Sequence, residues 1–538
     1  MARTEQFIFL LLLVFSALCL PSIKAFSFNF SRNSHLAGII FPTPLSFNSA
    51  ASAAESNCHS HHRLAADADP PEYPVAGDAP PVKLDLKHHR PSSDKTKEAA
   101  LFDSTQKDFL RIQTLFRRAT EKKSTNNKQN QNPLPSLASA PKAANLGSPA
   151  PALAGRFVAT VESGVALGSG EYFIDVFIGT PPQHFSLILD TGSDLNWLQC
   201  LPCHACFEQS GPIYDPSSSS SYRNLSCTDP RCDLVSRPEL SASCPAVEDH
   251  SSCPYFYWYG DHSNTTGDLA TEIFTVNLTG TIGGTTSRKV ESVIFGCGHW
   301  NRGLFHGAAG LLGLGRGPLS FASQLRSLYG HAFSYCLVDR NSDLSVSSKL
   351  IFGEDPSLLA HPQLNFTSFT TGKENPAETF YYLHIKGIKV GGEMLDIPMD
   401  TWDVLENGAG GTIIDSGTTL SYFSEPAYGI IRKAIEKKVT YKVFEQFPVL
   451  SPCYNVSGVE KVKMPEFSIV FSDEAVWDFP MENYFIRLEP ESIMCLAILG
   501  TPKTSLSILG NYQQQNFHIM YDTKNSRLGF APMKCAEV

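Results

Sequence analysis

One short pattern occurs twice in this chain of 538 residues, and it constrains the fold more than any other feature. Residues 185–197 read FSLILDTGSDLNW, and residues 411–419 read GTIIDSGTT. In each copy an apolar run leads to an aspartate, a hydroxyl residue, a glycine and a second hydroxyl residue. The apolar run predicts a buried strand, and the glycine permits a tight turn at its end. The two aspartates, Asp190 and Asp415, lie 225 positions apart (415 − 190).

A second matching element follows each aspartate. It consists of two bulky aliphatic residues and a glycine, at residues 311–313 and again at 508–510. A buried carboxylate is costly unless it is hydrogen-bonded or shares a proton. Either motif alone could be a structural strand end whose aspartate only accepts backbone hydrogen bonds. Because the plan is repeated, we favour two similar lobes that bring Asp190 and Asp415 face to face.

With both motifs intact, residues 168–538 resemble the pepsin-like aspartic proteases, and within them the nepenthesin-type branch known from plants. The resemblance implies an all-β, bilobal fold in which two lobes related by a pseudo-twofold axis enclose a central cleft. We expect the N-terminal lobe over residues 156–345 and the C-terminal lobe over residues 346–538. The implied activity is endopeptidase cleavage of polypeptides at acid pH, without metal or cofactor. Asp190 and Asp415 are the implied catalytic pair, sharing one proton and activating a water.

The resemblance also assigns supporting roles around the two aspartates. The hydroxyls of Thr191 and Ser416 are expected to tie the two loops together, and those of Ser193 and Thr418 to donate to the outer carboxylate oxygens. Gly192 and Gly417 complete the two turns.

A mobile hairpin, the flap, is expected to close over the substrate. Residues 253–259 alternate aromatic side chains and run into a turn, which by itself also fits a core strand. Tyr259 matches the flap tyrosine of the family, and Trp197 its packing partner. Asn511 stands where pepsin has aspartate, which removes one carboxylate near the cleft and is expected to alter the pH profile.

The amino-terminal part has a different composition. Residues 1–25 read as a signal peptide, with an apolar run over residues 7–20 and the small residue Ala25 as the candidate cleavage point. Residues 26–155 are expected to be a pro-segment with a flexible linker over 119–155. Within the pro-segment, 81–90 alternates like a short strand and 98–118 has helical spacing. We expect a secreted zymogen, destined for the extracellular space or the vacuole.

Charge divides the chain at the linker. Residues 1–156 hold 18 Lys/Arg and 12 Asp/Glu, a net charge of +6, whereas residues 157–538 hold 25 and 41, a net charge of −16. An uninformative solvated linker is one explanation. A basic pro-segment attracted to an acidic catalytic body is the other, and it fits the zymogen. The candidates to face the catalytic carboxylates are Lys83, Lys87, His88, His89 and Arg90. Activation should cut the chain between about 119 and 170, within or just beyond this exposed linker.

Fourteen cysteines suit a secreted, disulfide-bonded protein. The resemblance implies the pairs Cys200–Cys203, Cys206–Cys297, Cys227–Cys253, Cys232–Cys244, Cys336–Cys535 and Cys453–Cys495. Metal ligation by Cys200, Cys203 and Cys206 is the less favoured alternative. Glycosylation acceptor triplets begin at Asn224, Asn264, Asn277, Asn365 and Asn455.

Other classes of function fit less well. The acidic body argues against nucleic acid as a partner, and no apolar stretch after the leader reaches the length of a membrane span. The sequence contains no Gly-x-Ser-x-Gly motif of the kind that would indicate a serine hydrolase. We expect a monomer whose partners are polypeptide substrates and its own pro-segment. The main rival is a catalytically silent binding protein on the same fold, resembling plant xylanase inhibitors.

Overall fold

The computed structural model describes part of the chain. Its described residues are 105, 107, 108, 111, 112, 115, 157–163, 170–235, 252–259, 263–279, 285–303, 305, 307–340, 342, 346–370, 378–445, 449–488 and 492–538. The expectations for the signal peptide, for the strand over 81–90 and for the linker over 119–155 fall outside these residues. So does Cys244.

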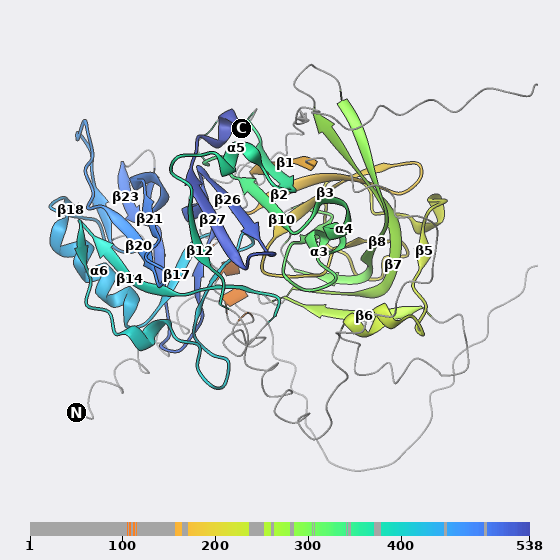
Figure 1. Ribbon diagram of the computed structural model, residues 1–538, viewed down its shortest axis with the longest axis horizontal. Coiled ribbons are helices and arrows are strands. Elements are labelled where there is room, and N and C mark those ends of the chain that lie inside the picture. The colour runs from red at the N-terminus through yellow and green to blue at the C-terminus, as the bar shows by residue number, and fades with distance from the viewer. Residues whose placement is uncertain are drawn as a thin grey trace, which may run out of the picture. The chain divides into compact units, whose positions relative to one another are not determined.

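The expected all-β class is confirmed, and in the described residues the largest sheet has 14 strands (Figure 1). Its main path runs β12-β27-β26-β10-β11-β1-β2-β3-β9-β4-β8-β7-β5, and β6 pairs with β7. The bounds are β1 Phe157–Ser163, β2 Tyr172–Ile178, β3 Gln183–Asp190, β4 Trp197–Gln199, β5 Arg223–Asn224, β6 Cys253–Trp258, β7 Asn264–Thr279, β8 Thr285–Arg302, β9 Gly310–Gly313, β10 Ala332–Cys336, β11 Ser348–Phe352, β12 Asn365–Ser368, β26 Phe517–Asp522 and β27 Arg527–Pro532.

Three smaller sheets come from the second half of the described chain. Their strand orders are β13-β16-β25-β17-β24, β15-β14-β20-β21 and β18-β19-β23-β22. The bounds are β13 Tyr381–Leu383, β14 Ile385–Val390, β15 Glu393–Met394, β16 Thr412–Ile414, β17 Ser421–Ser424, β18 Lys442–Val443, β19 Cys453–Asn455, β20 Phe467–Phe471, β21 Val476–Phe479, β22 Phe485–Leu488, β23 Ile493–Leu496, β24 Ile498–Thr501 and β25 Ser507–Leu509.

Helices are short, apart from α6. The sequence predicts a helix over 425–439, and α6 spans Ala427–Lys438 with Ala427, Ile431 and Ile435 buried on one face. The others are α3 Phe321–Gln324, α4 Arg326–Tyr329, α5 Pro356–Leu359 and α7 Asn511–Gln514, with 3-10 turns η2 Pro216–Ser218, η3 Pro230–Leu234, η5 Met399–Trp402, η6 Met481–Asn483 and η7 Cys535–Glu537.

The duplicated sequence plan becomes a duplicated strand arrangement. Strand β3 lies parallel to β9, with Asp190 opposite Gly313, and β16 lies parallel to β25, with Ile414 opposite Leu509. In the first copy the amide of Leu314 donates to the carbonyl of Asp190, and in the second the amide of Asp415 donates to the carbonyl of Leu509. Each aspartate is therefore held at the end of a parallel strand pair.

The glycine at the start of β9 is required by close packing. A Cβ on Gly310 would lie closer than 3.0 Å to the backbone of Trp197 and Leu198 on the neighbouring strand. Glycine at this position therefore lets β9 pack closely against β4, next to the strand that carries Asp190.

The largest sheet joins strands from both halves of the chain. Strands β26 and β27, near the C-terminus, lie beside β10 (Figure 1), and Phe333 of β10 is opposite Tyr521 of β26. Strand β11 also pairs with both β1 and β10. The sheet thus continues across residue 345, where the sequence places the boundary between lobes, and that boundary remains a prediction.

Disulfide pairing differs from the expectation around the first lobe. Strand β4 runs parallel to β8 with Leu198 opposite Cys297. Cys200, which directly follows β4, has its Cα atom 5.3 Å from that of Cys297, and these two are bonded. Cys203 is bonded to Cys206. The expected pairs Cys200–Cys203 and Cys206–Cys297 are therefore wrong, because the strand register was invisible in the sequence.

Disulfide partners also differ from the expectation in the neighbouring loop. Cys253 is bonded to Cys232 of η3. Cys253 was expected to bond to Cys227, and Cys232 to Cys244, so both of these expected pairs are also wrong. Cys227 is itself disulfide-bonded. The expected pairs Cys336–Cys535 and Cys453–Cys495 are present.

Candidate active site

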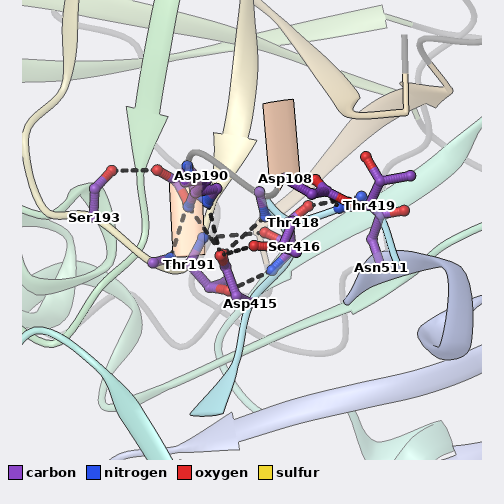
Figure 2. A network of polar contacts seen from close by, with 12 residues as sticks. Asp108, Asp190, Thr191, Ser193, Asp415, Ser416, Thr418, Thr419 and Asn511 are labelled. Carbon is purple, nitrogen blue, oxygen red and sulfur yellow. Dashed lines mark hydrogen bonds and ion pairs between the residues drawn. The ribbon is translucent and has the colours of Figure 1, made fainter. Parts of the chain in front are cut away.

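The two motif aspartates lie together, although 225 positions separate them. Asp190 ends β3 and Asp415 directly follows β16, and both side chains are fully buried. Two reciprocal hydrogen bonds join their loops (Figure 2): the amide of Thr191 donates to Ser416 Oγ at 3.0 Å, and the amide of Ser416 donates to Thr191 Oγ1 at 2.9 Å. The expected tie between the loops is present.

Each carboxylate is held in the same way by its own loop. The amides of Gly192 and Gly417 donate to the Oδ1 atoms of Asp190 and Asp415, both at 2.9 Å. The hydroxyl of Ser193 donates to Asp190 Oδ2, and that of Thr418 donates to Asp415 Oδ2 at 2.6 Å. These are the hydroxyl donors that the family resemblance implied. The arrangement is symmetric down to individual oxygens.

The glycines of the two turns allow the carboxylates to approach each other. A Cβ on Gly192 would lie closer than 3.0 Å to Asp415 Oδ1, and a Cβ on Gly417 would lie closer than 3.0 Å to Asp190 Oδ1. Each loop therefore needs glycine because the aspartate of the other loop fills the space.

A basic residue of the amino-terminal region lies on this pair. The described residues among 105–115 are helical, in agreement with the helix predicted over 98–118. The Arg111 guanidinium donates from Nε to Asp415 Oδ2 at 2.9 Å, from Nη2 to Asp415 Oδ1 at 3.1 Å, and from Nη2 to Asp190 Oδ1 at 2.5 Å. A planar guanidinium suits this double contact, because its fixed fork can meet both carboxylates at once.

Arg111 is a basic residue that the sequence-based assignment of this contact did not name. The candidates for facing the carboxylates were Lys83, Lys87, His88, His89 and Arg90. All five lie outside the described residues and stay a prediction, whereas Arg111 is in contact with the pair. The available signal was an arginine on an amphipathic helix of the predicted pro-segment, beside the apolar residue Ile112. That helix was predicted from its apolar spacing alone.

The electrostatics of the pair are unequal. Burial opposes ionisation of both carboxyls. Against it, the Arg111 guanidinium, the Ser193 hydroxyl and the Gly192 amide lower the pKa of Asp190 below its ordinary value. The pKa of Asp415 is raised, because its burial and the nearby charge of Asp190 outweigh Arg111. Asp190 is therefore the member that more readily carries the negative charge while Arg111 is present.

The same helix makes a second polar contact with the body. The carboxylate of Asp108 accepts from the amide of Thr419 at 2.8 Å (Figure 2). It also accepts from the amide of Leu420 at 2.9 Å and from the Tyr422 hydroxyl at 3.2 Å. Burial nevertheless raises the pKa of Asp108 to about 7, although the two amides oppose the shift.

Apolar packing accompanies these polar contacts. Ile112 and Leu115 are 2% and 3% exposed and belong to one buried cluster with Ile413, Leu420 and Ile508. Complete burial of such side chains contributes about 1.5–3 kcal/mol each. The helix is therefore held by a hydrophobic face as well as by its charges.

Trp197 and Tyr259, the two residues assigned to the flap, contact each other. Strand β6 pairs with β7, and Tyr259 directly follows it. The indole Nε1 of Trp197 donates to the Tyr259 hydroxyl at 2.7 Å, and Phe305 packs edge-on against both rings. Residues 260–262, which follow Tyr259, lie outside the described part.

Asn511 is used as a double donor. Its Nδ2 donates at 3.0 Å to the carbonyls of both Gly170 and Ser416, and the side chain is fully buried. An ionised aspartate could not donate either bond. The Asn511 side chain thus joins Gly170, which lies just before β2, to the loop that carries Asp415.

Other features of the described residues bear on the alternatives. Among them no group of His, Cys, Asp and Glu has the arrangement to hold a metal ion. None of the described helices is long and apolar enough to cross a membrane. Of the glycosylation candidates, Asn224, Asn365 and Asn455 are exposed and Asn264 is half-buried, while the side chain of Asn277 lies outside the description.

Comparison with known structures agrees with the bilobal fold. A structure titled "Crystal structure of edgp" matches with a TM-score of 0.59 and 20% identity, covering 71% of this chain and 96% of the other. Basic 7S globulin from soybean matches with a TM-score of 0.55, also at 20% identity, covering 71% and 98%. The chain has the fold of the pepsin-like proteins.

Sequence comparisons define the family. The models described as xylanase inhibitor N-terminal and C-terminal match residues 172–354 and 380–532. Aspartyl protease family protein 2 of Arabidopsis thaliana is 40% identical, over 71% of this chain and 74% of the relative. Aspartic proteinase nepenthesin-2 of Nepenthes gracilis is 38% identical, over 70% and 80%. The chain belongs to the pepsin-like aspartic protease family, in the branch that contains the plant nepenthesins.

Proposed function

We propose that this protein is an aspartic endopeptidase in which Asp190 and Asp415 activate a water to hydrolyse peptide bonds. The observation that carries the proposal is the symmetric pair of buried carboxylates, each held by a glycine amide and a hydroxyl of its own loop. Two carboxylates this close share one proton, because like charges at short range do not both ionise.

The shared proton divides the chemical work. The ionised member takes a proton from water as the water attacks the peptide carbonyl, and the protonated member donates a hydrogen bond to the carbonyl oxygen. The leaving amine is then protonated. Because the two groups titrate together, the roles belong to the pair and not to one fixed aspartate. The chain's own residues supply this chemistry without a metal or cofactor.

The zymogen is part of the same proposal. The Arg111 guanidinium lies on both carboxylates, where the attacking water must bind, and the helix around it is packed against the cleft through Ile112 and Leu115. Release of this helix is therefore required for activity. Acid favours release at this contact, since protonation of the pair removes the charges that hold Arg111. A secretory route to the extracellular space or the vacuole fits the amino-terminal leader.

A catalytically silent binding protein is the second candidate. It is favoured by one observation, that the two family models carry the description of xylanase inhibitors. The intact hydrogen-bond set on both carboxylates favours the enzyme instead, because binding of a partner protein would not need it.

The test is acid activation of the purified full chain, followed by digestion of a denatured protein with and without pepstatin. We expect pepstatin-sensitive digestion. Asp190→Asn and Asp415→Asn should each abolish it while the protein stays folded, since asparagine is nearly isosteric. The exposed Asp400→Asn is the matched control. Retention of more than a few per cent of activity in either Asp190→Asn or Asp415→Asn contradicts the mechanism. No digestion by the activated wild type contradicts the function.

A further inference from the structure

A cavity of about 400 Å³ lies where the loop after β9, the helix α4 and the turn after β26 meet, and neither aspartate of the dyad lines it. Its lining contains four basic side chains, those of Arg316, Arg326, His331 and Lys524. Among the described residues that line it, none is an aspartate or a glutamate. The surrounding body is acidic, with 41 Asp/Glu against 25 Lys/Arg in residues 157–538. The charge of the cavity is therefore opposite to that of the protein around it.

Tertiary contacts hold the segments of this lining together. Gly330 has a φ of 83°, in the left-handed region that favours glycine, and it ends α4 and turns the chain into β10. His331 follows this turn. The amide and the hydroxyl of Thr523 both donate to the His331 carbonyl, at 2.9 and 2.7 Å, which fixes the turn that carries Lys524. The basic side chains thus meet because of the fold and not because they are neighbours in the sequence.

Two of the basic side chains lack a counter-charge. In the part of the chain that the structure describes, no carboxylate lies within ion-pair distance of Arg326 or Lys524. The carboxylate of Asp194 is close to the backbone of the lining, but its Oδ1 accepts from the Gly317 amide at 2.8 Å and its Oδ2 from the Thr379 hydroxyl at 2.7 Å. Like charges gathered in one cavity repel each other. An anion in the cavity would relieve this repulsion.

Aromatic side chains form a rigid part of the wall. Phe333 and Tyr381 both line the cavity and are 2% and 1% exposed. The Tyr381 hydroxyl donates to the Leu314 carbonyl at 2.9 Å, which fixes its ring. Burial raises the pKa of Tyr381 well above its ordinary value, and the guanidiniums of Arg316 and Arg326 oppose this shift. Both guanidiniums therefore lie within electrostatic range of the same point of the wall.

We propose that this cavity binds a small organic molecule that carries more than one phosphate group. Guanidinium groups suit phosphate, because their planar fork can donate two parallel hydrogen bonds to its oxygens. The volume falls within the range of small-molecule sites, about 300–1,000 Å³, and exceeds what a single oxyanion of five heavy atoms fills. Basic side chains from separate segments can each meet a different phosphate. This site lies outside the proposed protease chemistry and does not depend on it.

The test titrates the purified full chain with myo-inositol hexakisphosphate in a calorimeter at physiological ionic strength. We expect one saturable site per chain. Arg326→Gln and Lys524→Gln should each weaken binding about tenfold or more, because each removes charge-assisted hydrogen bonds to phosphate. Both side chains are exposed, so the unfolding midpoint without the probe should stay unchanged. Lys442→Gln, at an exposed position of β18 outside the cavity, is the matched control and should keep the wild-type affinity.

The other outcomes decide against the site. Equal weakening in Lys442→Gln and in the cavity variants reports a diffuse attraction to basic side chains and overturns the proposal. Absence of saturable binding overturns it too, as does equally tight binding of inorganic phosphate. Cosedimentation with vesicles that contain phosphatidylinositol 4,5-bisphosphate, without binding of the soluble probe, indicates a lipid surface as the ligand and contradicts a small molecule.

A second measurement uses stability. The soluble probe should raise the unfolding midpoint of the wild type, because a ligand that binds only the folded state stabilises it. This rise should be lost in the double variant Arg326→Gln/Lys524→Gln, and an undiminished rise there overturns the site. Neither measurement involves peptide cleavage, so failure of the anion site and failure of the protease function are distinguishable.

Discussion

Replacement of Arg111 by alanine should release the pro-segment helix from the cleft. Arg111 is 8% exposed and makes three charge-assisted hydrogen bonds to the two aspartates. Truncating one partner of such a buried charge pair costs about 2–5 kcal/mol. Since about 1.4 kcal/mol is a factor of ten, the released fraction of the pro-form should rise by about 30-fold to 4,000-fold. Packing of Ile112 and Leu115 remains and sets how much of the helix stays docked.

Two measurements on the uncut pro-form follow this change. The initial rate of hydrolysis of a fluorogenic peptide at mildly acid pH should be higher for Arg111→Ala than for the wild type, with the intact chain verified on a gel. Amide hydrogen exchange at residues 105–115 should be faster in the variant at neutral pH. Arg432→Ala is the matched control, because Arg432 is an exposed residue of α6 that pairs with Glu436. Equal peptide hydrolysis and equal exchange in Arg111→Ala and wild type would refute the blocking role of Arg111.

Three further predictions concern the pH dependence, the flap and the loop tie. First, burial raises the pKa of Asp108 to about 7, so docking of the helix takes up a proton. Docking therefore strengthens as pH falls from about 7 toward the ordinary value of 3.8. Protection of the helix amides from hydrogen exchange should rise over that pH window in the wild type and stay flat in Asp108→Asn. The pKa of Asp190 is lowered in the docked state, so its contribution to docking is complete above pH 3.8 and is lost as pH falls through that lowered pKa. Activation of the wild type should therefore begin below about pH 4. Onset of activity near neutral pH would contradict this. Second, Trp197→Phe removes the donor to the Tyr259 hydroxyl and should reduce kcat/KM about tenfold, by an effect on the order of 1–3 kcal/mol. The rate is measured well below the unfolding midpoint, because truncation of this fully buried side chain also lowers stability. An unchanged rate would rule out that bond as a support of the flap. Third, Thr191→Ala leaves the buried Ser416 amide without its acceptor and should lower the free energy of unfolding by about 1–3 kcal/mol in a denaturant titration, whereas the exposed Thr228→Ala should change it little.

Much of the site was accessible from the sequence because its determinants are local. An apolar run ending in Asp-Thr-Gly-Ser or Asp-Ser-Gly-Thr specifies a strand, a turn and the donors to the carboxylate. The amides of Gly192 and Gly417 and the hydroxyls of Ser193 and Thr418 are within three residues of the aspartates they serve. Repetition of the pattern then indicated that the two turns meet.

The cysteine pairs show where such reasoning fails. Cys200 and Cys203 are close in sequence, but β4 and β8 place Cys200 beside Cys297, 97 positions away. A disulfide requires a short distance between Cα atoms, and strand register decides which cysteines have it. Two of the pairs implied by family resemblance are present, and they join positions 42 and 199 residues apart.

The sequence by itself determined the duplicated strand-and-turn units, the all-β class and the two aspartates, because each depends on residues that are neighbours along the chain. Only the tertiary structure decided that Arg111 occupies the pair, that Lys107 forms an ion pair with Glu171, and that Asn511 joins two carbonyls. The contacts of Arg111 with Asp190 and Asp415 span 79 and 304 positions. Charge and amphipathicity are properties of the local sequence, but the partner of a charge is chosen by which surfaces become adjacent when the chain buries its apolar side chains.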